Sequence, residues 1–208
     1  MLYVHAIFNA NLDKHTVELA TYHVRLLQET IANLSNPDGG KYLSNPSAFA
    51  LDNGTIVLAY SRAQGGPGGT GVSTAPHWKG PYTRLFHPLP KEKSPFKNGK
   101  NWSIAGCGED PFIYKDFRDT WRILCHGGTD KEEGTETVGM AFSTDLLNWT
   151  PGPGPAATSM MHYKDGSTRK FGKRERPALL LDDKGFPLVL YNGVQVRTFT
   201  IVCIDGRA

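Results

Sequence analysis

The stretch Glu109-Asp110-Pro111-Phe112-Ile113-Tyr114 decides the fold, because the chain repeats its pattern at two other places. The counterparts open at Asn45-Pro46 and at Arg176-Pro177, so the period is 65 or 66 residues. In each copy a short apolar run is followed by a turn cluster rich in Asp, Asn and Gly and then by a β-branched and aromatic run. This pattern is typical of a β-hairpin, and its repetition indicates a fold built from copies of one unit.

A second strand-forming segment follows each of the first two hairpins. Residues 71–74 lead to Trp78, and residues 139–144 lead to Trp149. Two more strands fit there, so each repeat is predicted to form four antiparallel strands, which is one blade of a β-propeller. The period exceeds the roughly 50 residues of kelch blades and the roughly 40–45 of WD repeats. A protein-interaction propeller of the kelch kind is therefore disfavoured, and long loops are expected.

The sequence thus predicts an all-β chain with blades at residues 43–95, 108–160 and 174–208. Propellers have about 4–8 blades, so three repeats and about 40 leading residues do not close a ring. Residues 1–30 contain strand-like runs that suggest the remnant of an earlier blade. The expectation is an N-terminally incomplete propeller, and a small three-sheet β-protein is the alternative.

Composition argues against two classes of partner. The net charge of +3 comes from 23 basic and 20 acidic residues, which is a balanced surface. Residues 164–176 are locally basic, but they lack the interleaved aromatics of a nucleic-acid platform, so no nucleic-acid partner is expected. No run approaches the ~18 apolar residues of a membrane span, and the N-terminus has no signal-peptide pattern.

Evidence on the cellular compartment is divided. The cysteines form an odd set without metal-ligand spacing, which favours buried thiols over a disulfide framework; they are Cys107, Cys125 and Cys203. Four Asn-X-Ser/Thr sequons favour a secreted parent protein, although two of them fall at hairpin turns where Asn is common anyway. The sequons begin at Asn33, Asn53, Asn101 and Asn148.

Candidate chemistry lies just before the three prolines. The first strand of each blade lines the central channel, so the aligned pairs Ser44-Asn45, Glu109-Asp110 and Glu175-Arg176 should meet at one mouth, with Arg174 beside them. Like charges brought close destabilise a fold, so such a cluster suggests a functional site. The alternative is a solvated ion-pair network in which Asp110 only caps a turn.

These three strands, together with AFSTDLLNWT at residues 141–150, resemble the five-bladed propellers of the arabinanase, levansucrase and invertase superfamily. The closest resemblance is to glycoside hydrolase family 43, and it covers nearly the whole chain. It implies that the repeats are blades three, four and five. Glu109 then matches the general acid, with Asp110 beside it, and Asn45 stands where the family has an orienting aspartate. The family's general base has no match, because its blade is missing.

The resemblance implies a glycoside hydrolase acting on an oligo- or polysaccharide. A general acid must keep its proton near neutral pH, which we expect burial of Glu109 beside Asp110 to favour. Direct displacement needs two carboxylates about 6.5–9.5 Å apart, and this chain offers one side only, so it is expected to be inactive alone. The alternative, which Asn45 favours, is a degenerate propeller that binds a glycan or a protein without turnover.

Sugar binding also needs flat apolar surfaces. Trp102, in the Gly-rich loop of residues 98–108, is the best candidate, and Phe112 and Tyr114 follow Glu109 on its strand. The repeated Trp78 and Trp149 are expected to pack structurally.

Two further expectations concern ions and histidine. His126 is expected at the far end of its strand, as a structural residue. A calcium or other ion occurs in the channel of related folds, but no ligand set is readable here, so no cofactor is expected.

Overall fold

The computed structural model describes residues 43–62, 69–85, 109–130, 135–196 and 199–206. The regular elements in these ranges are thirteen β-strands, and the described residues contain no helix, which confirms the all-β prediction. Residues 1–30 and Trp102 lie outside the described ranges. Among the described residues, no helix is long and apolar enough to cross a membrane.

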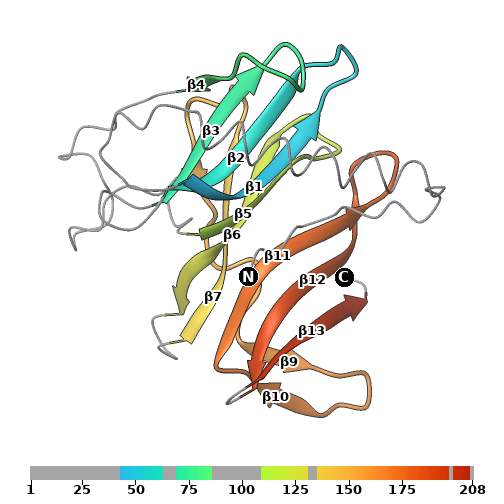
Figure 1. Cartoon of the computed structure of the whole chain (residues 1–208). Helices are drawn as coiled ribbons and strands as arrows, with labels where there is room; N and C mark the ends of the chain where they lie inside the picture. Colours follow the sequence, from blue (N-terminus) through green and yellow to red (C-terminus); the bar gives the residue numbers. More distant parts are fainter. Residues whose placement is uncertain (1–42, 63–68, 86–108, 131–134, 197–198, 207–208) are drawn as a thin grey trace.

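The first sheet is an antiparallel meander in sequence order (Figure 1). Its strands are β1 (Leu43–Ala50), β2 (Ile56–Arg62), β3 (Gly69–Ala75) and β4 (Thr83–Leu85).

The second sheet joins two further meanders. In the first of them, β5, β6 and β7 are antiparallel and the short β8 pairs with β7; in the second, β11, β12 and β13 are antiparallel. One parallel pair, Lys173 opposite Glu136, connects β11 to β7. The bounds are β5 (Glu109–Lys115), β6 (Trp121–Asp130), β7 (Thr135–Ser143), β8 (Thr150–Pro151), β11 (Lys173–Leu181), β12 (Pro187–Val196) and β13 (Phe199–Gly206). A separate hairpin consists of β9 (Met160–His162) and β10 (Thr168–Lys170).

The three repeated hairpins close with the same turn. The N–H of the first turn residue donates to the carbonyl oxygen four residues later, at 2.8 Å for Leu51 and 2.9 Å for Asp116 and Asp182. The fourth turn position is left-handed each time, with φ of 84° at Gly54, 61° at Asp119 and 83° at Gly185. The sequence repeat is therefore a repeat of backbone conformation as well.

The residue before each repeated proline is also left-handed. Asn45, Asp110 and Arg176 have φ of 50°, 49° and 50°, and each lies at a break in the strand register. Proline has no N–H to donate to a ladder, so a bulge at this point is expected. A left-handed residue with a side chain costs roughly 1–2 kcal/mol, and it occurs here at the same position in three successive strands.

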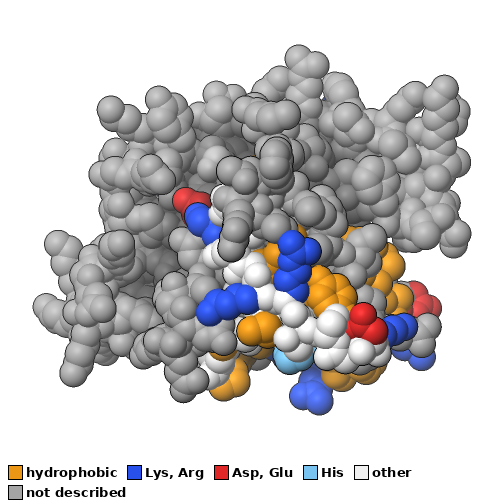
Figure 2. Space-filling model, turned by 90° about the horizontal axis from the view of Figure 1, so that it is seen from below, with side chains coloured by type: hydrophobic (Ala, Val, Ile, Leu, Met, Phe, Trp, Pro, Cys, Tyr) orange, Lys and Arg blue, Asp and Glu red, His pale blue; other side chains and the backbone are white. Residues whose placement is uncertain are grey.

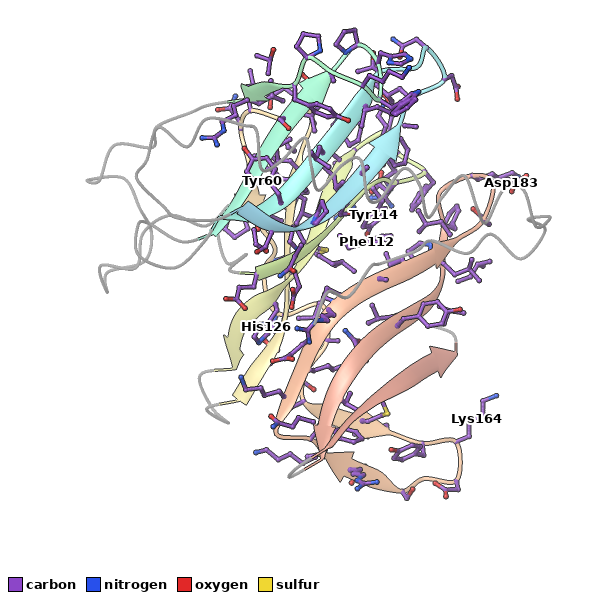
Figure 3. The ribbon with its side chains drawn as sticks, in the orientation of Figure 1. Tyr60, Phe112, Tyr114, His126, Lys164 and Asp183 are labelled. Atoms are coloured by element: carbon purple, nitrogen blue, oxygen red, sulfur yellow. The ribbon has the colours of Figure 1, made fainter. Side chains whose placement is uncertain are left out.

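The strands β5 to β7 are buried on both faces. On one face Ile113 and Ile123 pack against Val57 of the first sheet. On the other face Phe112 and Tyr114 pack toward β11 (Figure 3). Burial on both sides explains why β5 is a continuous apolar run. It also corrects the expectation that Phe112 and Tyr114 offer sugar-binding surfaces, because they are only 3% and 4% exposed.

Two other sequence expectations meet the structure in this core. Trp149 packs against the core cluster that contains Ile113 and Ile123, and its indole N–H donates to the Leu146 carbonyl at 2.9 Å. It is therefore structural, as its repetition indicated. Cys125 is fully buried and disulfide-bonded, whereas the sequence favoured a buried thiol. Cys107 lies outside the described residues.

Candidate active site

The structure brings the three residues before the prolines into one row. Asn45 Nδ2 donates to Asp110 Oδ1 at 2.5 Å, and Arg176 Nε lies 4.0 Å from Asp110 Oδ2. Each carboxylate oxygen of Asp110 thus faces a different neighbour, an amide from β1 or a guanidinium from β11. The left-handed backbone that the three residues share is the local feature common to both contacts.

Asp110 is the buried centre of this row. It is 4% exposed, and its own N–H donates to Ser61 Oγ at 3.0 Å. A second serine of the first sheet, Ser47, accepts from the Ile113 N–H at 3.0 Å, so two side chains bond the bulged part of β5 to the first sheet. Burying a carboxylate is costly unless it is hydrogen-bonded and paired, and Asp110 meets both conditions. Its position suits orienting its neighbours better than contacting a large ligand.

Glu109 differs from Asp110 in its exposure. Its side chain is 52% exposed, and Glu109 Oε2 lies 3.9 Å from His126 Nδ1. The expectation that Glu109 is buried was therefore wrong. The reason lies in the strand: Glu109 is its first residue and stands outside the two packed faces that bury Phe112 to Tyr114.

His126 lies at the same end of the sheet as Glu109, opposite it across the strand pair. The expectation that it stands at the far end was wrong, because the hairpin returns β6 antiparallel to β5 and brings its later residues back to the start. Counting from the Lys115–Trp121 pair would have placed Glu109 opposite residue 127, next to His126, and the bulge between Glu109 and Phe112 accounts for the difference of one residue. The imidazole is buried, with a side chain 10% exposed.

Glu175 and Arg176 form the other side of the site. Arg176 Nη1 lies 3.2 Å from Glu175 Oε2, and Lys173 Nζ lies 3.5 Å from Glu175 Oε1. Arg176 thus connects the carboxylates of Glu175 and Asp110, and its side chain remains 36% exposed. Part of the cluster is an ion-pair network, as the alternative interpretation expected.

Arg174 has a different environment. It is 4% exposed, its Nε donates to Asn192 Oδ1 at 2.9 Å, and its Nη1 donates to the Thr158 carbonyl at 3.1 Å. Asn192 Nδ2 in turn donates to the Glu175 carbonyl at 3.4 Å. These bonds give Arg174 a structural position that holds β11 to β12 and to the segment before β9.

The same cluster offers three possible metal ligands among the described residues. Donor atoms of Glu109, Asp110 and His126 lie within 4.8 Å of one another. Calcium takes six to eight oxygen ligands, whereas this set contains an imidazole. The Arg176 guanidinium beside Asp110 further opposes a cation. The described residues of this cluster therefore do not fit the calcium ion that the resemblance allowed.

The arrangement provides an exposed carboxyl group that can exchange a proton with a ligand, next to a fixed and buried carboxylate. The exposed part of Arg176 can donate to a hydroxyl group. Among the described residues, His126, Ser61 and Ser47 are members of this site that the sequence reasoning did not select. For the serines no signal was available, because their contacts cross between repeats.

Comparisons with known proteins concern the fold. No family model and no curated protein matches this sequence. The structure is similar to that of an endo-arabinase from Bacteroides thetaiotaomicron, with 16% identity, a TM-score of 0.54, and coverage of 85% of this chain and 60% of that chain. This chain therefore spans 60% of the length of the endo-arabinase.

Two other solved structures superpose on this chain less well, and no argument rests on them. A putative glycosidase from Bacteroides thetaiotaomicron has 20% identity and a TM-score of 0.43, covering 77% of this chain and 46% of that one. A family 43 β-xylosidase/α-arabinofuranosidase from a compost metagenome has 17% identity and a TM-score of 0.44, covering 76% and 44%. On the stronger match, the chain shares the propeller fold of the endo-arabinase over the part of that protein which it covers.

Proposed function

We propose that this chain is part of a glycoside hydrolase in which Glu109 is the general acid. The observation that carries the proposal is the convergence of Asn45 and Arg176 on the buried Asp110, directly beside the exposed Glu109. A reacting group must be reachable by the substrate, and its neighbours must be held in place. Glu109 meets the first condition and Asp110 meets the second.

Each residue then has a distinct role. Glu109 donates a proton to the glycosidic oxygen as the bond breaks. Asp110 is the fixed charge that orients the site, and Asn45 supplies a hydrogen bond where an aspartate would add a second charge. Glu175 and Arg176 are proposed to contact sugar hydroxyls, and Trp102 to stack on a sugar face, although Trp102 lies outside the described residues.

The architecture in this proposal is a five-bladed propeller of which the chain supplies three blades. The three meanders β1–β4, β5–β8 and β11–β13 support it, since each begins with a strand that carries a left-handed residue before proline. The general base is not assigned among the described residues. Hydrolysis by direct displacement needs that second carboxylate on the opposite face of the sugar ring.

The test compares rates of hydrolysis between substrates with poor and good leaving groups. It uses the protein encoded by the longest open reading frame that contains the chain. The wild type and Glu109→Gln are assayed on natural oligosaccharides and on activated aryl glycosides. The variant should lose roughly 10²–10⁴ in rate on the natural substrates, the usual contribution of one positioned acid, and much less on aryl glycosides that leave unaided. Asp183→Asn removes a carboxylate from the exposed turn at the other end of β11 and is the control (Figure 3). Full activity of Glu109→Gln on a natural substrate would reject the assignment.

A second candidate function is binding of a glycan without turnover. The neutral amide of Asn45 favours it, because the resemblance places a charged aspartate there. Turnover discriminates between the two candidates, since a hydrolase cleaves at least one of the oligosaccharides that it binds. If the wild type binds oligosaccharides but cleaves none of the linkages tested, the binding function is the correct one.

A further inference from the structure

We propose that the hairpin of residues 160–173, called here the basic hairpin, binds the carboxylate groups of an acidic polysaccharide, a polyuronate. The carbohydrate class of this ligand rests on the proposed function; the acidic character rests on the hairpin itself. The positive charge of this segment lacks the interleaved aromatics of a nucleic-acid platform, and the proposed catalytic site does not use it.

The basic hairpin carries an excess of positive charge on an exposed surface. Residues 162–170 are nine consecutive exposed residues. Four cations and one carboxylate give residues 160–173 a net charge of +3, which equals that of the whole chain. The cations are Lys164, Arg169, Lys170 and Lys173. Lys173 pairs with Glu175, and Lys170 also has a partner in the chain, so the proposal depends on Lys164 and Arg169.

The one carboxylate of the basic hairpin is committed to its turn. Asp165 Oδ1 accepts from the Ser167 N–H at 2.9 Å and from the Ser167 hydroxyl at 2.6 Å. The hydroxyl bond, followed by the backbone bond, lowers the pKa of Asp165 below its ordinary value. The carboxylate therefore stabilises the turn, and no ion pair with Lys164 or Arg169 accompanies these bonds in the described part of the chain.

The basic hairpin is anchored to the rest of the fold. Met161 and Phe171 are buried against Val194 of β12. The Phe171 N–H donates to the Ser159 carbonyl at 3.0 Å, and the Gly172 N–H donates to the Gln195 carbonyl at 3.1 Å. An isolated two-stranded hairpin is marginal in water, so this anchoring is what orders it. An ordered surface loses less conformational entropy when it binds a ligand.

The two cations are displayed from this anchored base. The Arg169 guanidinium lies over the Phe171 ring, 5.3 Å from its centroid, which positions the charge. Lys164 is at the tip of the basic hairpin and projects outward (Figure 3). Directly before Lys164 in the sequence, Tyr163 is 40% exposed and offers an aromatic surface to a sugar ring.

The location connects the basic hairpin to the candidate active site. It leads directly into β11 (Lys173–Leu181), which starts at the lower end of the molecule in Figure 1 and carries Glu175 and Arg176 as its third and fourth residues. Seen from below, Lys and Arg side chains spread over the described part of this face (Figure 2). A polymer longer than the site would therefore meet positive charge as it leaves, and charge complementarity favours an acidic one. Binding of single-stranded nucleic acid relies on a series of stacking aromatics, and the basic hairpin exposes Tyr163 alone among its described aromatic side chains.

The experiment measures binding of the chain to polygalacturonate, with neutral arabinan and single-stranded RNA as comparison probes. The test variant is Lys164→Gln with Arg169→Gln. The control is Lys184→Gln with Arg118→Gln, which makes the same charge change at the opposite end: Lys184 is also in an Asp- and Gly-containing turn, and Arg118 also lies over a phenylalanine, 5.0 Å from the Phe117 ring. Circular dichroism confirms that both variants are folded.

Polygalacturonate should bind more tightly than arabinan, and added salt should weaken it because exposed charges are screened. The test variant should lose about fivefold in affinity, as expected for two exposed ion pairs of ordinary strength, and the control less than twofold. Equal losses in both variants would show a response to net charge only and overturn the proposal. The proposal would also be overturned if polygalacturonate did not bind. It would likewise be overturned if RNA bound more tightly than polygalacturonate and lost the same affinity in the test variant. None of these results depends on hydrolysis, so failure of the proposed enzymatic function is a separate outcome.

Discussion

The first strands of the three repeats, β1, β5 and β11, have left-handed residues near both ends, but the residue types differ between the two ends. At the turn end, two of the three left-handed positions are glycines, Gly54 and Gly185. At the proline end, all three carry side chains, Asn45, Asp110 and Arg176. Glycine adopts this conformation without steric cost, so two of the three turns avoid backbone strain at this position. The proline end accepts strain of about 1 kcal/mol or more per residue, which is common where side chains are needed for function.

The surroundings of the two ends differ in the same sense. At the proline end the strained residues contact one another through polar groups centred on Asp110. At the turn end the contact is apolar: the rings of Phe117 and Phe186 stack with centroids 3.8 Å apart and planes at 8°, joining the turns of successive repeats. Polar contacts between left-handed residues at one end, and an apolar contact between turns at the other, support the proposal that the proline end is functional and the turn end structural.

The largest stability effect is expected at the proline end. Asp110→Ala should lower the free energy of unfolding by about 3 kcal/mol, because it leaves Arg176 and Asn45 without their buried acceptor and places alanine in a left-handed conformation. Asp110→Asn should cost less, since asparagine tolerates this conformation. Urea unfolding measures both. Exposed Asp183→Ala is the control and should change stability by about 0.5 kcal/mol or less. If Asp110→Ala changed the free energy of unfolding no more than that control, the contacts of Asp110 with Asn45 and Arg176 would not contribute to stability.

A pair of glycine variants tests the turn end. A Cβ on Gly185 would lie 3.0 Å from the Lys115 carbonyl oxygen, whereas the nearest atom to a Cβ on Gly54 is 4.0 Å away. Both substitutions to alanine meet the same backbone penalty, since φ is 83° and 84°. We therefore expect losses of about 2–3 kcal/mol for Gly185→Ala and about 1 kcal/mol for Gly54→Ala, measured by urea unfolding. Equal losses would mean that packing between successive turns adds nothing.

A smaller effect is expected from the pH dependence of the second turn. Burial raises the pKa of Asp116, but the hydrogen bond from Arg122 and those from the Thr120 and Arg118 N–H groups outweigh it and hold the pKa below its ordinary 3.8. Because the folded-state pKa is the lower one, the ionised carboxylate stabilises the fold above 3.8, and this contribution is lost as the pH falls through the folded-state value.

Asp116→Asn should therefore cost about 1–2 kcal/mol at neutral pH and should reduce the acid-induced loss of stability. Thermal melting from neutral to acidic pH measures this difference. Asp165→Asn is the comparison, because its carboxylate also accepts hydrogen bonds in a turn but is fully exposed. An Asp116→Asn variant with the unchanged pH profile of the wild type would contradict the assignment.

The sequence alone allowed prediction of the local features of this protein. The spacing of Pro46, Pro111 and Pro177 predicted the repeat, and the Asp- and Gly-rich clusters predicted hairpin turns; the structure has both. The all-β class follows from the same patterns. These features depend on backbone preferences of a few neighbouring residues and on the alternation of side chains along a strand, so they can be recognised without knowing what packs where.

The tertiary structure decided which of the aligned residues touch and which are accessible. Glu109 and Asp110 are neighbours in sequence, yet one is half exposed and the other is buried. Arg174 and Arg176 were both expected to contact a ligand, but Arg174 is held inside the fold by Asn192 and Thr158. These outcomes depend on register breaks and on contacts between residues that are 16 to 65 positions apart in the sequence. Such contacts are set by how whole sheets pack, and no local pattern in the sequence encodes them.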